Sequence, residues 1–196
     1  MAFVLCYSFY MSEEGRLEQV KIHIDEWKPT TPEADQEFFD KVTPELRGLK
    51  ERHKRNLQEN NSQLPEESIQ KSLTYLNNRL RALKPGDTVP LARLGNHVAG
   101  FILVRWDEQE KRTQIEQFYV DTEHRSKGIG TRLLERAMQH ARQTRPEESV
   151  GIFLTTEETN EGAQRLYERM GFHRSSIPAP TEGEIRLELD FGTEPQ

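Results

Sequence analysis

A turn rich in glycine and basic side chains is the part of the sequence whose residue types point most directly to chemistry. It reads Arg-Ser-Lys-Gly-Ile-Gly at residues 125–130. The bulky run 115–120 before it predicts a β-strand, and apolar residues at threes and fours from Ile129 to Ala141 predict a helix after it. The first N–H groups of a helix lack internal partners, and glycines let such groups converge on a ligand. The expected ligand is a phosphate or pyrophosphate.

The turn also has other interpretations. A Gly-x-Gly pair alone also occurs in an ordinary turn between a strand and a helix. The turn lacks the Gly-Lys-Ser/Thr ending of the phosphate loop in nucleotide hydrolases. The three-glycine fingerprint of dinucleotide-binding domains is also missing.

The longer pattern is Arg-x-x-Gly-x-Gly, preceded by a strand that ends in Val120-Asp121. It resembles the acyl-CoA-binding signature of the GCN5-related N-acetyltransferase (GNAT) superfamily. A second block at residues 160–172 is similar to the Asn…Ala…Tyr…Gly-Phe block of the same family. The two blocks follow in family order and spacing, with an apolar strand at 150–155 between them. Together they cover roughly residues 87–190.

This resemblance implies an α/β (α+β) fold of the GNAT type. We expect a mixed, mostly antiparallel central sheet with helices on both faces. The central strand near 115–120 and the strand near 150–155 would splay apart, and acyl-CoA would lie in the gap.

The chain length favours one domain with short additions at its ends. Met11 as an alternative start would make the first ten residues an extension. The expected organisation is an N-terminal extension (1–19), a single acetyltransferase domain (20–190) with a helical part at about 31–84 and an acyl-CoA-binding core at about 87–190, and a C-terminal tail (191–196).

Two segments of the helical part left alternatives open. Residues 50–61 are charged and nearly without apolar side chains, which is typical of a solvated helix end or a mobile loop. A second helix carries apolar residues in steps of four and three between Ile69 and Leu83. That stripe predicts packing on the sheet, with a homodimer seam or a substrate-covering helix as the alternatives.

The composition excludes several classes of function. A net charge of −6 argues against a general nucleic-acid surface. One cysteine, Cys6, leaves no internal disulfide framework, and no apolar run has the length that spans a bilayer. We therefore expect a cytoplasmic protein without a membrane or nucleic-acid partner. The six histidines show no ligand spacing, so we predict no metal.

The resemblance implies transfer of an acetyl group from acetyl-CoA to a primary amine, by direct attack in a ternary complex. An amine is mostly protonated at neutral pH and needs a base, and the leaving thiolate needs an acid. Glu116, on the central strand, is the candidate base. Strand periodicity would place it on one face with Phe118 and Val120, in a partly apolar setting. Tyr167 is the candidate acid on the sulfur.

The resemblance also assigns residues to acetyl-CoA. The turn would hold the pyrophosphate through its N–H groups, and Ser126 stands where the family often has glycine. Backbone groups of Val120 would bind the pantetheine arm and the acyl oxygen, and Asn160 would cap a helix and contact the same arm. The residues expected to bind acetyl-CoA are Phe118, Tyr119, Val120, Arg125, Ser126, Lys127, Gly128, Ile129, Gly130, Thr131, Asn160 and Ala163.

The amine acceptor stays open, as a small molecule or a peptide. A polyamine is compatible with Glu116 and with the acidic balance of the chain. The rival interpretation is an acyl-CoA-binding sensor or scaffold without catalysis, which would have no need of Glu116 and Tyr167.

Overall fold

The structure is a computed structural model that describes residues 6–11, 17–28, 32–60, 65–144 and 146–192. Met1 and most of the predicted C-terminal tail lie outside these ranges. None of the described helices has the length and apolar composition that crossing a membrane requires.

The described strands form one sheet in the order β1-β2-β3-β4-β5-β6-β8-β7. Neighbours are antiparallel except β5 and β6, which run parallel. The predicted mixed, mostly antiparallel sheet is confirmed. The strands are β1 (Cys6–Met11), β2 (Leu17–Trp27), β3 (Val89–Leu94), β4 (His97–Asp107), β5 (Arg112–Val120), β6 (Gly151–Glu157), β7 (His173–Arg174) and β8 (Glu184–Asp190).

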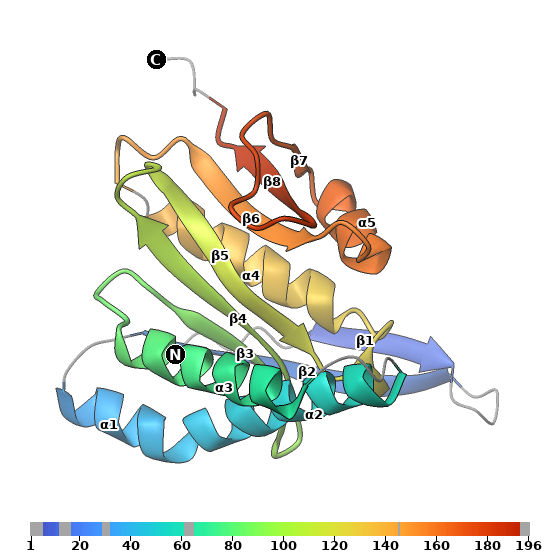
Figure 1. Ribbon diagram of the computed structural model, residues 1–196. Helices are drawn as coiled ribbons and strands as arrows, with labels where there is room; N and C mark the ends of the chain where they lie inside the picture. Colours follow the sequence, from blue (N-terminus) through green and yellow to red (C-terminus); the bar gives the residue numbers. More distant parts are fainter. Residues whose placement is uncertain (1–5, 12–16, 29–31, 61–64, 145, 193–196) are drawn as a thin grey trace.

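Helices cover both faces of this sheet (Figure 1). One face carries the three N-terminal helices, and α4 crosses the other. The break between α1 and α2 falls at Val42, just before the Thr43-Pro44 pair. The helices are α1 (Pro32–Lys41), α2 (Thr43–Asn60), α3 (Glu66–Arg81), α4 (Ile129–Thr144) and α5 (Glu161–Arg169), with a short 3₁₀ turn at Thr122–His124.

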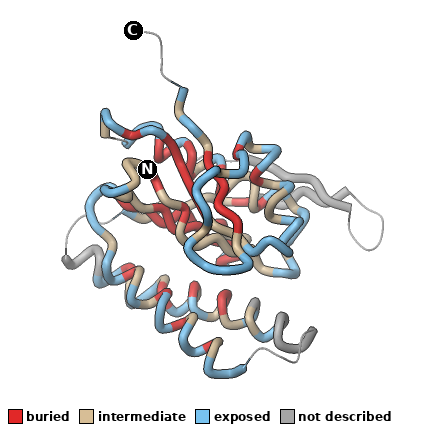
Figure 2. Tube along the Cα trace, turned by 45° about the horizontal axis from the view of Figure 1, so that its top comes forward, coloured by how far each residue is buried: buried red, intermediate tan, exposed pale blue. Residues whose placement is uncertain are grey.

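Two apolar clusters hold these layers together, and Figure 2 shows buried residues along the central strands and on the sides of the helices that face them. The first cluster joins the sheet to α4 and α5 and includes Ile115, Leu133 and Tyr167. The second joins the sheet to α1, α2 and α3 and includes Leu49, Leu76 and Phe101. Burial of the α3 stripe confirms that this helix packs on the protein.

A bulge in β5 sets the geometry of the sheet centre. Leu103 pairs with Gln117 and Val104 pairs with Ile115, so Glu116 is an extra residue on β5. The parallel pairing of β5 with β6 stops at the same point, after Ile115 and Leu154. A bulge bends its strand and increases the local twist. The two strands therefore separate beyond Ile115, as we expect for the splayed pair of strands.

The sequence was less informative at the N-terminal side. The predicted extension contains β1, which pairs with β2 from Cys6 opposite Ile22 to Met11 opposite Leu17. The charged segment from residue 50 is helical as far as Asn60. Its first residue, Lys50, is only 1% exposed, so the expectation of a solvated segment is wrong at that position.

A buried polar cluster fixes α4 to the edge of the first core. Glu26 on β2 forms an ion pair with Arg136 on α4, and its Oε1 lies 3.0 Å from Nδ1 of His140 on the same helix. His140 Nε2 lies 2.9 Å from the Gly86 carbonyl oxygen, and Thr88 Oγ1 donates to Glu26 at 3.1 Å. Burial acts to raise the pKa of Glu26, but the hydrogen bond from His140 and the charge of Arg136 outweigh it and lower that pKa to about 2.

This cluster predicts how stability depends on pH. Because the folded pKa of Glu26 lies near 2 and the ordinary value near 4.5, its contribution is complete above pH 4.5 and is lost as the pH falls toward 2. Glu26→Gln should lower the free energy of unfolding at neutral pH by about 2 kcal/mol, with the deficit shrinking in acid. Urea denaturation of both proteins from pH 7 to pH 2 measures it. Glu37→Gln, at an exposed carboxylate, is the control and should change little.

The packing around Gly151, at the start of β6, leads to a second prediction about stability. A Cβ there would lie 2.3 Å from the Leu189 carbonyl oxygen, a backbone atom that cannot rotate away as a side chain can. Gly151→Ala should lower the free energy of unfolding by about 1–3 kcal/mol. Gly162→Ala on α5, where a Cβ meets nothing within 4 Å, should instead leave it unchanged or raise it. Equal effects of the two substitutions in urea denaturation would contradict this packing.

Candidate active site

The glycine-rich turn lies between the end of β5 and the start of α4. Ser126 and Gly128 both have positive φ values, 60° and 76°, which bend the chain into the helix. The first helical hydrogen bond is the one from Arg132 N to Gly128 O (3.2 Å). The N–H groups of Ile129, Gly130 and Thr131 therefore have no intrahelical acceptor. This is the arrangement that binds a phosphate group.

The turn is held from two sides. Arg125 Nε donates to the Val120 carbonyl oxygen at 3.4 Å, and Arg52 on α2 donates to Asp121 at 2.9 Å. At Gly130 the helix comes so close to α5 that a Cβ would lie 3.2 Å from Leu166 Cδ2. The same Cβ would lie 3.6 Å from the Phe118 ring, so the turn, β5 and α5 are packed as one unit.

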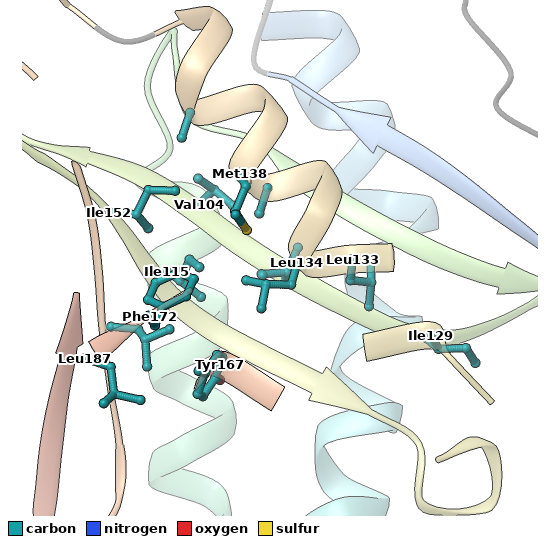
Figure 3. Close-up of a cluster of buried hydrophobic side chains, with 14 of the residues drawn as sticks. Val104, Ile115, Ile129, Leu133, Leu134, Met138, Ile152, Tyr167, Phe172 and Leu187 are labelled. Carbon is teal, nitrogen blue, oxygen red and sulfur yellow. The ribbon is translucent and has the colours of Figure 1, made fainter. Parts of the chain in front are cut away.

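Tyr167 is a core residue on the α4 side of the sheet. Its ring centroid lies 6.2 Å from that of Phe118 and 5.9 Å from that of Phe172. Figure 3 shows it beside Phe172 and Leu187, below the strand that carries Ile115. It is 5% exposed, and burial raises its pKa. Tyr167 therefore carries a protonated phenol next to the strand that borders the gap.

Glu116 lies on the opposite face from the one expected. Because it is the extra residue of the bulge, the side-chain alternation shifts there, and Phe118 and Val120 pack in the α4 cluster without it. Its carboxylate points toward α3 and accepts hydrogen bonds from Tyr75 Oη (2.6 Å) and from Arg79. The predicted shared face and partly apolar setting are wrong, since period two fails across a bulge.

The surroundings of Glu116 are polar and cationic. Arg105 Nη1 lies 3.4 Å from its second oxygen, and the side chain is only 3% exposed. Burial and the hydrogen bond to Glu116 raise the pKa of Tyr75 to about 12, so this phenol remains a donor. Glu116 is thus a buried carboxylate held by three donors from α3 and β4.

Lys50 on α2 lies next to this carboxylate. Its Nζ donates to Gln117 Oε1 at 2.8 Å and lies over the rings of Tyr119 (5.3 Å) and Tyr75 (5.9 Å). Burial and the charge of Lys54 lower the pKa of Lys50 to about 8, although the charge of Glu116 opposes them. Tyr119 itself stacks on Phe101 at 5.5 Å, on the helical face rather than beside Phe118.

The remaining predicted residues are placed by α5. Asn160 Oδ1 accepts from Ala163 N at 3.2 Å, so the predicted N-cap is confirmed. Ala163 packs against the first core cluster. The site thus has two sides, with Tyr167, Phe118 and the turn on the α4 side and Glu116, Tyr119 and Lys50 on the side of α2 and α3.

Sequence reasoning missed Lys50, Tyr75, Arg79 and Arg105. The only sequence signal was the spacing of Tyr75 and Arg79, which are four residues apart and so share one helix face. Nothing in the sequence linked that face to Glu116, because the contact joins residues 37 and 41 positions apart.

Comparison with known proteins agrees with this geometry. The chain matches the family model described as "Acetyltransferase (GNAT) family" over residues 51–172, which is more than half of its length. The chain belongs to the GNAT acetyltransferase family. The GNAT match covers both the turn and the block that carries Asn160 and Tyr167.

Individual GNAT relatives match over smaller parts. N-alpha-acetyltransferase 30 of Xenopus laevis is 38% identical over 87 residues, 43% of this chain and 31% of that protein. Spermine/spermidine N(1)-acetyltransferase of Bacillus subtilis (strain 168) is 32% identical over 111 residues, 56% of this chain and 60% of that protein. The chain thus spans less than two thirds of the length of either curated relative.

Among solved structures, protein PH1933 from Pyrococcus horikoshii OT3 superposes with a TM-score of 0.65. The alignment covers 88% of this chain and 100% of that one at 22% sequence identity. It shows a shared GNAT fold.

The positive φ at Ser126 yields a prediction on the turn. A non-glycine residue in the left-handed region costs about 1–2 kcal/mol, and β-branched residues are disfavoured further. Ser126→Gly should therefore leave the free energy of unfolding unchanged or raise it, whereas Ser126→Val should lower it by about 1–2 kcal/mol. Urea denaturation of the pair measures the difference. Equal stability of the two variants would contradict the left-handed conformation at this residue.

Proposed function

We propose that this protein transfers an acetyl group from acetyl-CoA to a primary amine by direct attack in a ternary complex. The observation that carries the proposal is the separation of β5 from β6 after Ile115, with a phosphate-binding turn at its end. At this separation β5 lies between a buried tyrosine, Tyr167, and a buried carboxylate, Glu116.

The donor side has the features that acetyl-CoA requires. The unpartnered N–H groups at the start of α4 suit the pyrophosphate, and Arg125 and Lys127 add positive charge beside them. Val120 offers backbone groups to the pantetheine arm and to the acyl oxygen. Thr131 and Asn160 border the same path. Acetyl-CoA supplies an activated thioester, and the residues of this chain orient it.

The acceptor amine must lose a proton before it attacks. With a pKa near 10.4, about one amine in a few thousand is neutral at pH 7, which is a handicap of about 4–5 kcal/mol. Glu116 takes this proton, directly or through water. Tyr75 and Arg79 hold its oxygen in the free protein, so one of them releases it as the acceptor arrives.

The thiolate of CoA must then leave. Tyr167 donates the proton to its sulfur. Burial raises the pKa of this phenol, so it is protonated at neutral pH and available as an acid. The amine attacks the thioester directly, so no step requires an acyl-enzyme, and the single cysteine, Cys6, lies on β1, four strands from β5 in the sheet.

Two classes of acceptor follow from the relatives. One relative is an N-alpha-acetyltransferase, and another acts on spermine and spermidine. We propose a primary amine of a small molecule or a peptide for this chain. The cytoplasmic location stays a prediction, and so does formation of a homodimer.

Tyr167→Phe tests the chemistry. The variant should slow thiol release from acetyl-CoA by roughly ten-fold or more, because the acid is lost while the packed ring remains. Release of free CoA thiol over a panel of polyamines, amino acids, aminoglycosides and short peptides measures it. The melting temperature and the affinity for acetyl-CoA are the controls and should stay unchanged.

Three outcomes separate the interpretations. Release with one amine class that depends on Tyr167 supports the enzyme. Equal turnover of the wild type and Tyr167→Phe removes the proposed role of the tyrosine. Binding of acetyl-CoA without thiol release from any amine would favour a sensor or scaffold instead.

A further inference from the structure

The face of β5 that α2 and α3 cover carries a local excess of positive charge. The chain as a whole has a net charge of −6. Three basic side chains, however, interact with Glu116, and a fourth acts on Lys50; we name these four the cationic cluster. They are Lys50, Lys54, Arg79 and Arg105.

Two members of the cationic cluster neutralise Glu116. Arg79 and Arg105 both form ion pairs with this carboxylate. Arg105 also lies 3.4 Å from Asp87, which is 5% exposed. Glu116 and Asp87 are therefore already paired with guanidinium groups from α3 and β4. A cationic acceptor would have to compete with both.

Lys50 forms no direct ion pair with any residue that the structure describes, although the charge of Glu116 acts on it. Among the described residues, no carboxylate oxygen lies within 4.0 Å of its Nζ, and its hydrogen bond goes to the neutral side chain of Gln117. It is 1% exposed, and Lys54 adds a like charge nearby. Burial of an ammonium group without a counter-ion is costly. An anion close to Lys50 would remove that cost.

The cluster has an open side. Tyr75 is 46% exposed and the Arg79 side chain 33% exposed, whereas Glu116 behind them is 3% exposed. A ligand that approaches Glu116 from this side passes these two side chains. It would then carry its substituents into the field of the cationic cluster.

The charge of one carboxylate on β6 also acts on this region. Burial and the charge of Glu157, at the end of β6, raise the pKa of Tyr119 to about 12. Glu157 is exposed, so water and salt screen its charge, whereas Lys50 acts through a poorly hydrated interior. Screening therefore weakens the effect of Glu157 on the covered face of β5, where Lys50 is 1% exposed.

We propose that the cationic cluster selects acceptors in which a carboxylate lies a few bonds from the primary amine, and that it disfavours polyamines. The inference rests on the proposed function and names its acceptor class. The two sources of this chemistry are a free amino acid and a peptide whose first residues are acidic. It revises the expectation that the acidic chain attracts a polycation, because the local charge has the opposite sign.

The test compares acceptors that differ only in charge. The tripeptides Ser-Asp-Ala, Ser-Asn-Ala and Ser-Lys-Ala, as C-terminal amides, are assayed for thiol release with acetyl-CoA, beside spermine and beside serine and serinamide. The wild type should show a kcat/KM for the acidic peptide at least roughly ten-fold above that for the basic one, or the same preference for serine over serinamide. The first result assigns a peptide acceptor and the second an amino acid.

Lys50→Met separates selection from folding. A buried charge can be replaced by an apolar side chain of similar shape without loss of stability, so this variant should fold. It should reduce the preference for the carboxylate toward unity, mainly through KM. Lys71→Met on α3, at a lysine whose side chain is 75% exposed and paired with Glu67, is the matched control and should keep the preference.

Outcomes against the proposal are distinct from failure of the enzyme. Thiol release that is fastest with spermine or with the basic peptide would overturn the charge selection while leaving the acetyltransferase intact. An unchanged preference in a folded Lys50→Met would remove the role of Lys50. Silence with every amine would reject the proposed function, and the selection with it.

Discussion

The structure depends on the loss of pairing between two parallel strands at its centre. β5 and β6 share a ladder only as far as Ile115 and Leu154, and the bulge at Glu116 turns β5 away at that point. Beyond it each strand is held from its outer side alone, β5 by β4 and β6 by β8. The backbone along the separation is therefore left facing a region where a ligand can pair with it. The glycine-rich turn and α4 begin at the end of this separation, so one bend in one strand opens a gap beside the turn that we propose binds the pyrophosphate.

The same bend divides the chemistry between two faces. Phe118 and Val120 continue into the core with Tyr167, whereas Glu116 and Tyr119 face the N-terminal helices. Tyr167 and Glu116, which we propose as the acid and the base, then stand on opposite sides of β5. The helices α2 and α3 do more than cover the sheet, since they supply Lys50, Tyr75 and Arg79 to the face that carries Glu116. Their charges oppose the net charge of the chain, which shows why a whole-chain value is a poor guide to one site.

Local signals were sufficient for the glycine-rich turn and for the cap of α5. The order of strand, turn and helix around Gly128, and the cap at Asn160, follow from residue types at fixed short spacings, which sequence displays directly. The surroundings of Glu116 depend on contacts between residues far apart in the sequence. A bulge leaves no mark in the alternation of a short strand, so the face of Glu116 was assigned wrongly. Lys50 lies in a segment of charged residues, and its burial follows from the way α2 rests on Tyr119 rather than from its neighbours in sequence.

We propose that acetyl-CoA lies between β5 and β6. The most direct test of this position is a crystal structure with a non-hydrolysable acetyl-CoA analogue. We expect the pyrophosphate on the N–H groups at the start of α4, the analogue of the thioester beside the backbone of Val120, and its sulfur position within reach of the Tyr167 hydroxyl. An analogue bound elsewhere would contradict this proposal, as would a pyrophosphate away from the start of α4 or a sulfur position on the side of Glu116.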